Sequence, residues 1–148
     1  MPHLGLLFSN NGGIGRWDRV GSLSRELALY KRFAQAGWEI SFFTYDDSSS
    51  FSIPDFNANI YPQAPIFLPK KFRNLYQWIL PYRYKKEGRK IDILLTNQAH
   101  SADPAVKAAT LWNCRLIARC GYVYGESAQV LGKKGKKSQR RIARERNV

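Results

Sequence analysis

The amino-acid sequence predicts an α/β protein with an open, parallel, Rossmann-like sheet and helices on both faces. Near the N-terminus a short apolar run ends in a glycine-containing loop, and an amphipathic helical pattern and a second apolar run follow it. This order of strand, loop, helix and strand is the pattern of a βαβ unit, whose strands are parallel. The alternation continues along the chain, and 148 residues suit one domain.

The first βαβ unit is expected within residues 4–44. Apolar residues 4–8 predict a strand, and the loop at 9–15 contains three glycines, which permit close backbone approach. We expect the helix to begin several residues beyond this loop and to stop at Gly37, a suitable C′ residue. Residues 38–44, rich in aromatic and β-branched side chains, predict the second strand. The apolar face of the helix, with spacings of three and four residues, comprises Val20, Leu23, Leu27, Tyr30 and Ala34.

The middle of the chain predicts two strands and a helix. Residues 59–61 indicate a short strand, after which several prolines interrupt the pattern. Residues 70–84 carry apolar side chains at near-helical spacing, and we expect that helix to end at Pro81. Residues 91–96 predict the next strand.

The last part of the chain predicts a helix, a strand and a basic tail. We expect the helix at 102–112, with Asp103 as its N-cap and Pro104 at its first position. Residues 115–119 indicate another strand. Eight cations then gather near the C-terminus, and about 133–148 predict a basic helical tail.

The composition is strongly basic, because 24 lysines and arginines against 11 acidic residues give a net charge of +13. Such a surface favours polyanions: nucleic acid, anionic lipid headgroups or phosphorylated substrates. No apolar run is long enough to span a bilayer, and the first residues lack the pattern of a secretory signal. Two cysteines, Cys114 and Cys120, are too few for a disulfide framework or a self-contained zinc site. We therefore expect a cytoplasmic protein that binds no metal.

Ligands of open α/β sheets gather at the carboxyl ends of the strands, so the residues that follow each predicted strand are candidate site residues. Gly12 and Gly13 lie in the first such loop. The loop is not a dinucleotide fingerprint, which would need glycine where Asp18 stands, and no Gly-Lys-Ser/Thr follows as in a P-loop. Its backbone N–H groups suit an anionic or sugar ligand. The alternative is a plain turn between strand and helix.

Three further strand ends carry polar side chains. Asn97 and Gln98 offer amides that both donate and accept hydrogen bonds, as hydroxyl recognition requires; the alternative is an ordinary polar loop. His100 lacks a suitably spaced partner, so no catalytic base is assigned. Arg119 can clamp a phosphate or carboxylate, and Tyr122 lies in the loop after it. The pair Asp46-Asp47 is interpreted as part of a serine-rich turn.

Residues 68–90 interleave aromatic and basic side chains. Such a segment can pack its apolar side on the sheet while its basic side faces water, which is the interpretation we favour. Attraction to an anionic membrane surface would be an additional role. Stacking with nucleic-acid bases is a third alternative.

Five segments together resemble the N-terminal domain of GT-B glycosyltransferases of family 4, and they span nearly the whole chain. They are LGLLFSNNGG at 4–13, GSLSRELALY at 21–30, GWEISFFTY at 37–45, DILLTNQ at 92–98 and RLIARCGY at 115–122.

The resemblance implies an enzyme of two Rossmann-like domains, the first holding the acceptor and the second the nucleotide sugar. It implies that Gly12 and Gly13 face the donor phosphates, with the nucleotide sugar as co-substrate and with no cofactor or metal. The acceptor would be a glycan or a lipid-linked glycan of cell-surface polysaccharide synthesis. From their strand-end positions, we expect Asn97, Gln98, Arg119 and Tyr122 to orient that acceptor.

The sequence departs from the family pattern in two ways. The second, donor-binding domain is missing, so we expect the first half of a transferase that is inactive alone. Many relatives also carry histidine after the strand that matches 115–119, where this chain has Cys120-Gly121-Tyr122. A basic nucleic-acid-binding module and an inactive truncated product are the alternative functions, although no recognised nucleic-acid motif is present.

Overall fold

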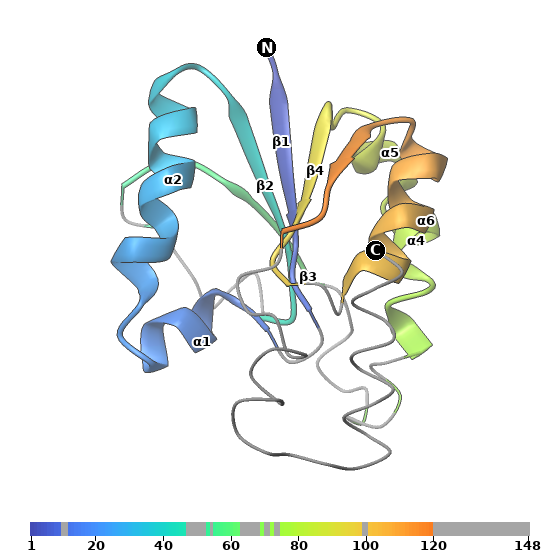
Figure 1. Ribbon diagram of the computed structural model, residues 1–148, viewed down its shortest axis with the longest axis horizontal. Coiled ribbons are helices and arrows are strands. Elements are labelled where there is room, and N and C mark those ends of the chain that lie inside the picture. Colours follow the sequence, from blue (N-terminus) through green and yellow to red (C-terminus); the bar gives the residue numbers. More distant parts are fainter. Residues whose placement is uncertain are drawn as a thin grey trace, which may run out of the picture.

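The structure, a computed structural model, describes residues 1–9, 12–46, 53, 55–62, 69, 72, 75–98 and 101–119. Five parallel strands form one open sheet in the order β3-β2-β1-β4-β5 (Figure 1), which confirms the predicted Rossmann-like fold. The strands are β1 (His3–Leu7), β2 (Glu39–Thr44), β3 (Asn59–Pro62), β4 (Ile93–Thr96) and β5 (Arg115–Ile117).

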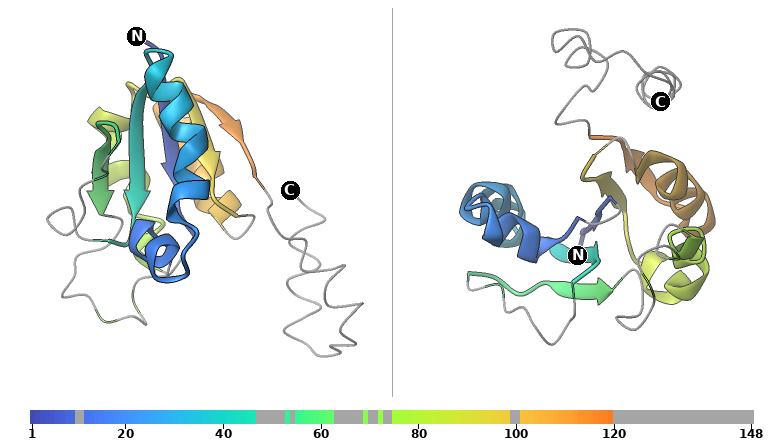
Figure 2. Two further views of the ribbon diagram at one scale, coloured as in Figure 1. Left: turned by 90° about the vertical axis from the view of Figure 1, so that its left-hand side faces the viewer. Right: turned by 90° about the horizontal axis from the view of Figure 1, so that it is seen from below.

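Helices cover both faces of the sheet, as predicted. Helices α1 (Ile14–Arg19) and α2 (Leu23–Gln35) lie on one side of the strands, whereas α4 (Leu80–Arg83), α5 (Lys85–Gly88) and α6 (Ala102–Trp112) lie on the opposite side, as Figures 1 and 2 show.

Alternate residues of the strands supply two separate apolar cores, because successive side chains of a strand point to opposite faces. Leu6 and Phe42 belong to the core beneath α1 and α2, which Tyr30 completes. Leu7 and Phe43 belong to the core beneath α4, α5 and α6. All five side chains are at most 2% exposed, so the central strands are apolar on both faces, as parallel strands usually are.

Trp112 joins the helices of the second core. Its ring centroid lies 5.0 Å from that of Phe43, and its indole N–H donates to the carbonyl of Pro81 over 2.8 Å. Gly88 passes so close to the indole ring that a Cβ there would overlap it. These contacts fix α4 and α5 against α6.

The helix after the glycine loop differs from the expectation in two respects. It begins at Ile14, directly after Gly13, and it is split into α1 and α2 by a turn in which Gly21 has φ +69°. Val20 is the C-cap residue of α1 and is 65% exposed, so its expected place on the buried face is wrong. Gly37, with φ +84°, stands at the C′ position of α2, as predicted.

Two prolines lie in the first turns of helices whose start or end differs from the expectation. Pro81 lies in the first turn of α4, so the expectation that a helix ends there is wrong. Helix α6 begins at Ala102 after Ser101, which makes Asp103 the second helical residue and Pro104 the third; the expected N-cap is therefore also wrong. The first turn of a helix has no intrahelical acceptor for its N–H groups, so it tolerates proline at several positions.

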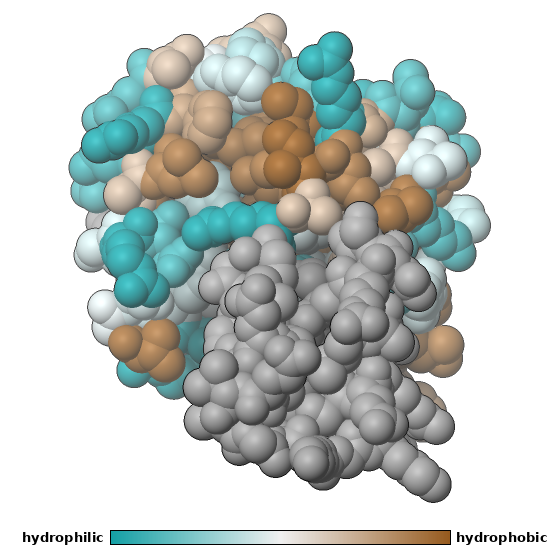
Figure 3. All heavy atoms as spheres, in the orientation of Figure 1, coloured by the Kyte–Doolittle hydropathy of each residue, from teal (hydrophilic) through white to brown (hydrophobic). Residues whose placement is uncertain are grey.

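The open side of the sheet between α2 and α6 exposes apolar side chains. Figure 3 shows them gathered over β4 and β5, where no helix of the described chain covers the strands. Ile93 is half-buried there and Ile117 is 52% exposed. The predicted basic tail lies outside the described residues. Within the described part of the chain, every helix is too short or too polar to cross a bilayer.

Candidate functional site

The order of the strands places two loops from the sequence analysis at one point of the sheet. After β1 the chain turns to α1 on one face, whereas after the neighbouring β4 it turns to α6 on the other face. Such a switch point is where open α/β sheets bind ligands. The N–H of Asn97 donates to the carbonyl of Leu7 over 2.9 Å, so the loops that begin there share the carboxyl edge.

Some N–H groups of the glycine loop already donate hydrogen bonds within the protein. The N–H of Gly12 donates to Ser9 over 2.7 Å, and that of Gly15 donates to the carboxylate of Asp46 over 3.2 Å. Within the described part of the chain, the N–H of Gly13 has no acceptor. The Gly13 amide is therefore available to a ligand.

Asp46 is a site residue that the sequence analysis did not assign. Its Oδ2 accepts the Thr44 hydroxyl over 2.7 Å as well as the Gly15 N–H, and its carboxylate lies where a Cβ on Gly13 would stand. The only sequence signal was its position just after a strand. An anion that binds the Gly13 amide must stay clear of this negative charge, whereas a sugar hydroxyl can donate to it.

Asn97 and Gln98 are held by their backbone atoms. The carbonyl of Gln98 accepts both the N–H and the hydroxyl of Ser101, over 3.1 and 2.8 Å. Asn97 is half-buried and Gln98 is exposed, and among the described residues neither side-chain amide has a hydrogen-bond partner. Both amides are thus presented at the carboxyl edge on a fixed backbone.

Arg119 follows β5 and reaches toward α2. Its N–H donates to the hydroxyl oxygen of Thr96 over 2.9 Å, and the Thr96 hydroxyl lies 3.3 Å from its carbonyl. The guanidinium stands 3.7 Å from a carboxylate oxygen of Glu26, a second residue that the sequence analysis missed. Burial raises the pKa of Tyr30 to about 12, and the positive charge of Arg119 opposes that rise. Tyr122, with His100 and Cys120, lies outside the described residues.

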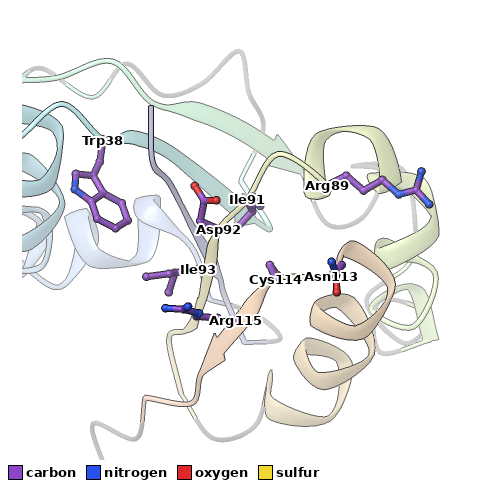
Figure 4. Close-up of a pocket in the computed structure, with 8 residues that line it drawn as sticks. All are labelled: Trp38, Arg89, Ile91, Asp92, Ile93, Asn113, Cys114 and Arg115. Carbon is purple, nitrogen blue, oxygen red and sulfur yellow. The ribbon is translucent and has the colours of Figure 1, made fainter.

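A concavity of about 620 Å³ lies at the opposite, amino edge of the sheet (Figure 4). Figure 4 shows Trp38, Ile93 and Arg115 on one side of β4, with Arg89 on the other side. Asp92 in this concavity already accepts the N–H of His3 over 2.8 Å. None of the proposed site residues that the structure describes lines this concavity.

The titratable groups of the described chain suggest no nucleophile. His3 Nε2 lies 2.7 Å from the Ser41 hydroxyl and Nδ1 lies 3.7 Å from Glu39, which resembles a catalytic triad, but Ser41 is fully buried and cannot reach a substrate. Burial raises the pKa of the half-buried thiol of Cys114. Among the described residues, no three His, Cys, Asp or Glu side chains gather as metal ligands would.

Comparison with known proteins adds no assignment. No protein-family model, no curated protein and no solved structure matches the chain. The fold therefore rests on the structure described above, and the resemblance to glycosyltransferases rests on the residues quoted for it.

Proposed function

We propose that the chain is the acceptor-side domain of a GT-B glycosyltransferase that transfers a sugar from a nucleotide sugar to a glycan or lipid-linked acceptor. One observation carries the proposal. The glycine loop and the loop of Asn97 and Gln98 diverge to opposite faces at adjacent strands of a parallel sheet. That arrangement supports a ligand site that combines a backbone amide with side-chain amides.

In the proposed reaction this domain acts by positioning and by electrostatic stabilisation. The Gly13 amide would donate to the diphosphate of the donor, where negative charge grows as the bond to the sugar breaks. Asn97 and Gln98 would orient acceptor hydroxyls, and Arg119 would bind an anionic group of the acceptor. Asp46 would accept a sugar hydroxyl. A second domain would bind the nucleotide, as the resemblance implies, and the product would belong to cell-surface polysaccharide synthesis at the inner face of the membrane.

The exposed side of the sheet gives this proposal further support. Ile117 is 52% exposed, and apolar side chains gather over β4 and β5 (Figure 3). An apolar patch beside an open strand edge is a surface that further protein commonly covers. A transferase with a second domain would supply such protein.

Two arginines at opposite ends of β5 provide a matched test. Arg119 follows the strand at the proposed site, whereas Arg115 begins it at the opposite edge, and both are exposed. Binding of glycans and of a polyprenyl phosphate analogue to the chain is measured by saturation-transfer NMR. We expect Arg119→Ala to weaken binding about tenfold, because a charge-assisted hydrogen bond is lost. Arg115→Ala should leave binding within about twofold.

Two results would contradict the proposal. One is equal loss of binding in the two arginine variants. The other is full turnover of sugar nucleotides by residues 1–148 alone, because the proposed domain needs a partner domain to bind the donor.

A further inference from the structure

A group of exposed side chains lies on α4 and on the residues before it, and the half-buried Lys107 of α6 completes it. We call this group the aromatic–basic surface, and it comprises Leu75, Trp78, Ile79, Tyr82, Arg83 and Lys107. Its four apolar side chains are all exposed: Leu75 by 63%, Trp78 by 39%, Ile79 by 48% and Tyr82 by 57%. Large apolar side chains rarely cluster in water without a partner, so their proximity requires an explanation.

Contacts between the two elements hold this surface in place. The ammonium group of Lys107, on α6, lies 5.9 Å from the ring centroid of Trp78 and 4.8 Å from that of Tyr82. Arg83 lies 5.2 Å from the ring centroid of Tyr84, whose hydroxyl donates to the Pro62 carbonyl over 2.6 Å. The surface is therefore formed before any ligand binds.

Cations outnumber acids around these side chains, although Asp103, one turn before Lys107 on α6, is an exposed acid. Between residues 75 and 90 there are five cations and one acid, Glu87. The five cations, all exposed, are Arg83, Lys85, Lys86, Arg89 and Lys90. Positive charge beside exposed aromatic and aliphatic side chains complements a bilayer with anionic headgroups.

We propose that the aromatic–basic surface binds the chain to an anionic lipid bilayer. Leu75, Trp78, Ile79 and Tyr82 enter the boundary between headgroups and acyl chains, where tryptophan and tyrosine are favoured. The surrounding lysines and arginines pair with lipid phosphates. This inference goes beyond the proposed function and does not depend on it.

The structure favours lipid over nucleic acid as the partner. Stacking with bases requires free ring faces, but Lys107 already covers a face of Trp78 and of Tyr82, and Arg83 lies over Tyr76 and Tyr84. Leu75 and Ile79 are aliphatic and offer no stacking surface, yet they are among the most exposed apolar residues. Insertion into a bilayer uses all four apolar side chains.

The test is co-sedimentation of the full chain with phosphatidylcholine vesicles that contain about 30 mol% phosphatidylglycerol, against vesicles without it. The variant Leu75→Ser/Ile79→Ser removes two exposed apolar side chains from the surface. Its matched control is Val20→Ser/Leu29→Ser, which removes two exposed apolar side chains, 65% and 42% exposed, on the α1 and α2 side. Far-UV circular dichroism verifies that both variants are folded.

We expect the chain to bind anionic vesicles and not vesicles of phosphatidylcholine alone. Leu75→Ser/Ile79→Ser should weaken this binding about fivefold or more, whereas the affinity of the control variant should stay within about twofold of wild type. Tryptophan emission should shift to the blue on binding, and part of the binding should persist at about 0.5 M NaCl, because apolar insertion is not screened. Equal binding by both variants would assign the attraction to other basic segments and overturn the proposal. Tight, steeply salt-dependent binding to RNA without vesicle binding would overturn it as well.

Discussion

The carboxylate of Asp46 packs against Gly13 so closely that no Cβ fits at that position. The carboxylate is held there by the Thr44 hydroxyl at 2.7 Å and by the Gly15 N–H at 3.2 Å. Gly13 thus has a structural requirement that is independent of any ligand. The same contact places a negative charge beside the Gly13 amide, which is available to a ligand.

Gly13→Ala should destabilise the protein, because the new methyl group displaces Asp46 from its two hydrogen bonds. We expect a loss of about 1–3 kcal/mol in the free energy of unfolding, measured by urea denaturation. In an Asp46→Ser background, where the side chain is shorter, the added cost of Gly13→Ala should fall by at least half. A cost that is unchanged in that background would mean that Asp46 does not cause the clash.

Gly88→Ala should be more costly, because its neighbour is a rigid ring rather than a short side chain. The indole of Trp112 is held by its hydrogen bond to Pro81 and cannot shift cheaply. We expect a loss of about 3 kcal/mol in a urea titration. Lys86→Ala, an exposed position in the same short helix, should change stability by less than about 0.5 kcal/mol. Similar losses in the two variants would contradict the packing of α5 on Trp112.

His3 should make stability depend on pH below neutrality. Burial lowers the pKa of His3 from 6.5, although the nearby Glu39 and Asp92 oppose this effect. At a pH between the lowered pKa of His3 in the folded chain and its pKa of 6.5 in the unfolded chain, the unfolded chain binds more protons. The contribution of His3 to stability is therefore complete above pH 6.5 and is lost as the pH falls. His3→Gln should flatten this dependence in urea titrations at pH 7.5, 6.5 and 5.5. His100→Gln is the control, and an equal flattening there would refute the assignment to His3.

The Tyr30 phenol should lose its proton only at high pH. Burial raises its pKa from 10.0 to about 12, so the folded chain keeps this phenol protonated where the unfolded chain releases the proton. Stability should therefore decrease as the pH rises above 10. Absorbance at 295 nm should show a component near pH 12 that Tyr30→Phe removes. Arg119→Gln should move that component higher, because the positive charge of Arg119 favours the phenolate; movement to lower pH would contradict the placement of Arg119.

Local patterns of the sequence predicted most of the secondary structure. The spacing of Leu27 and Tyr30 indicated the buried face of α2, and Gly37 indicated its end, because both signals depend on neighbouring residues only. Proline was less informative. Pro81 fits equally well just after a helix and within its first turn, and the structure places it in the first turn of α4, where the sequence analysis had ended a helix. Pro104 was expected at the start of a helix and does lie in the first turn of α6.

The sequence by itself determined the alternation of strands and helices, the parallel sheet and the strand ends where polar side chains gather, because hydrophobic period and turn residues act over a few positions. Only the tertiary structure decided which of those side chains meet. Asp46 lies on the glycine loop and Arg119 reaches Glu26 because the strands and helices that carry them pack together. Such contacts between distant segments depend on strand order and side-chain packing, which leave no local signal in one sequence.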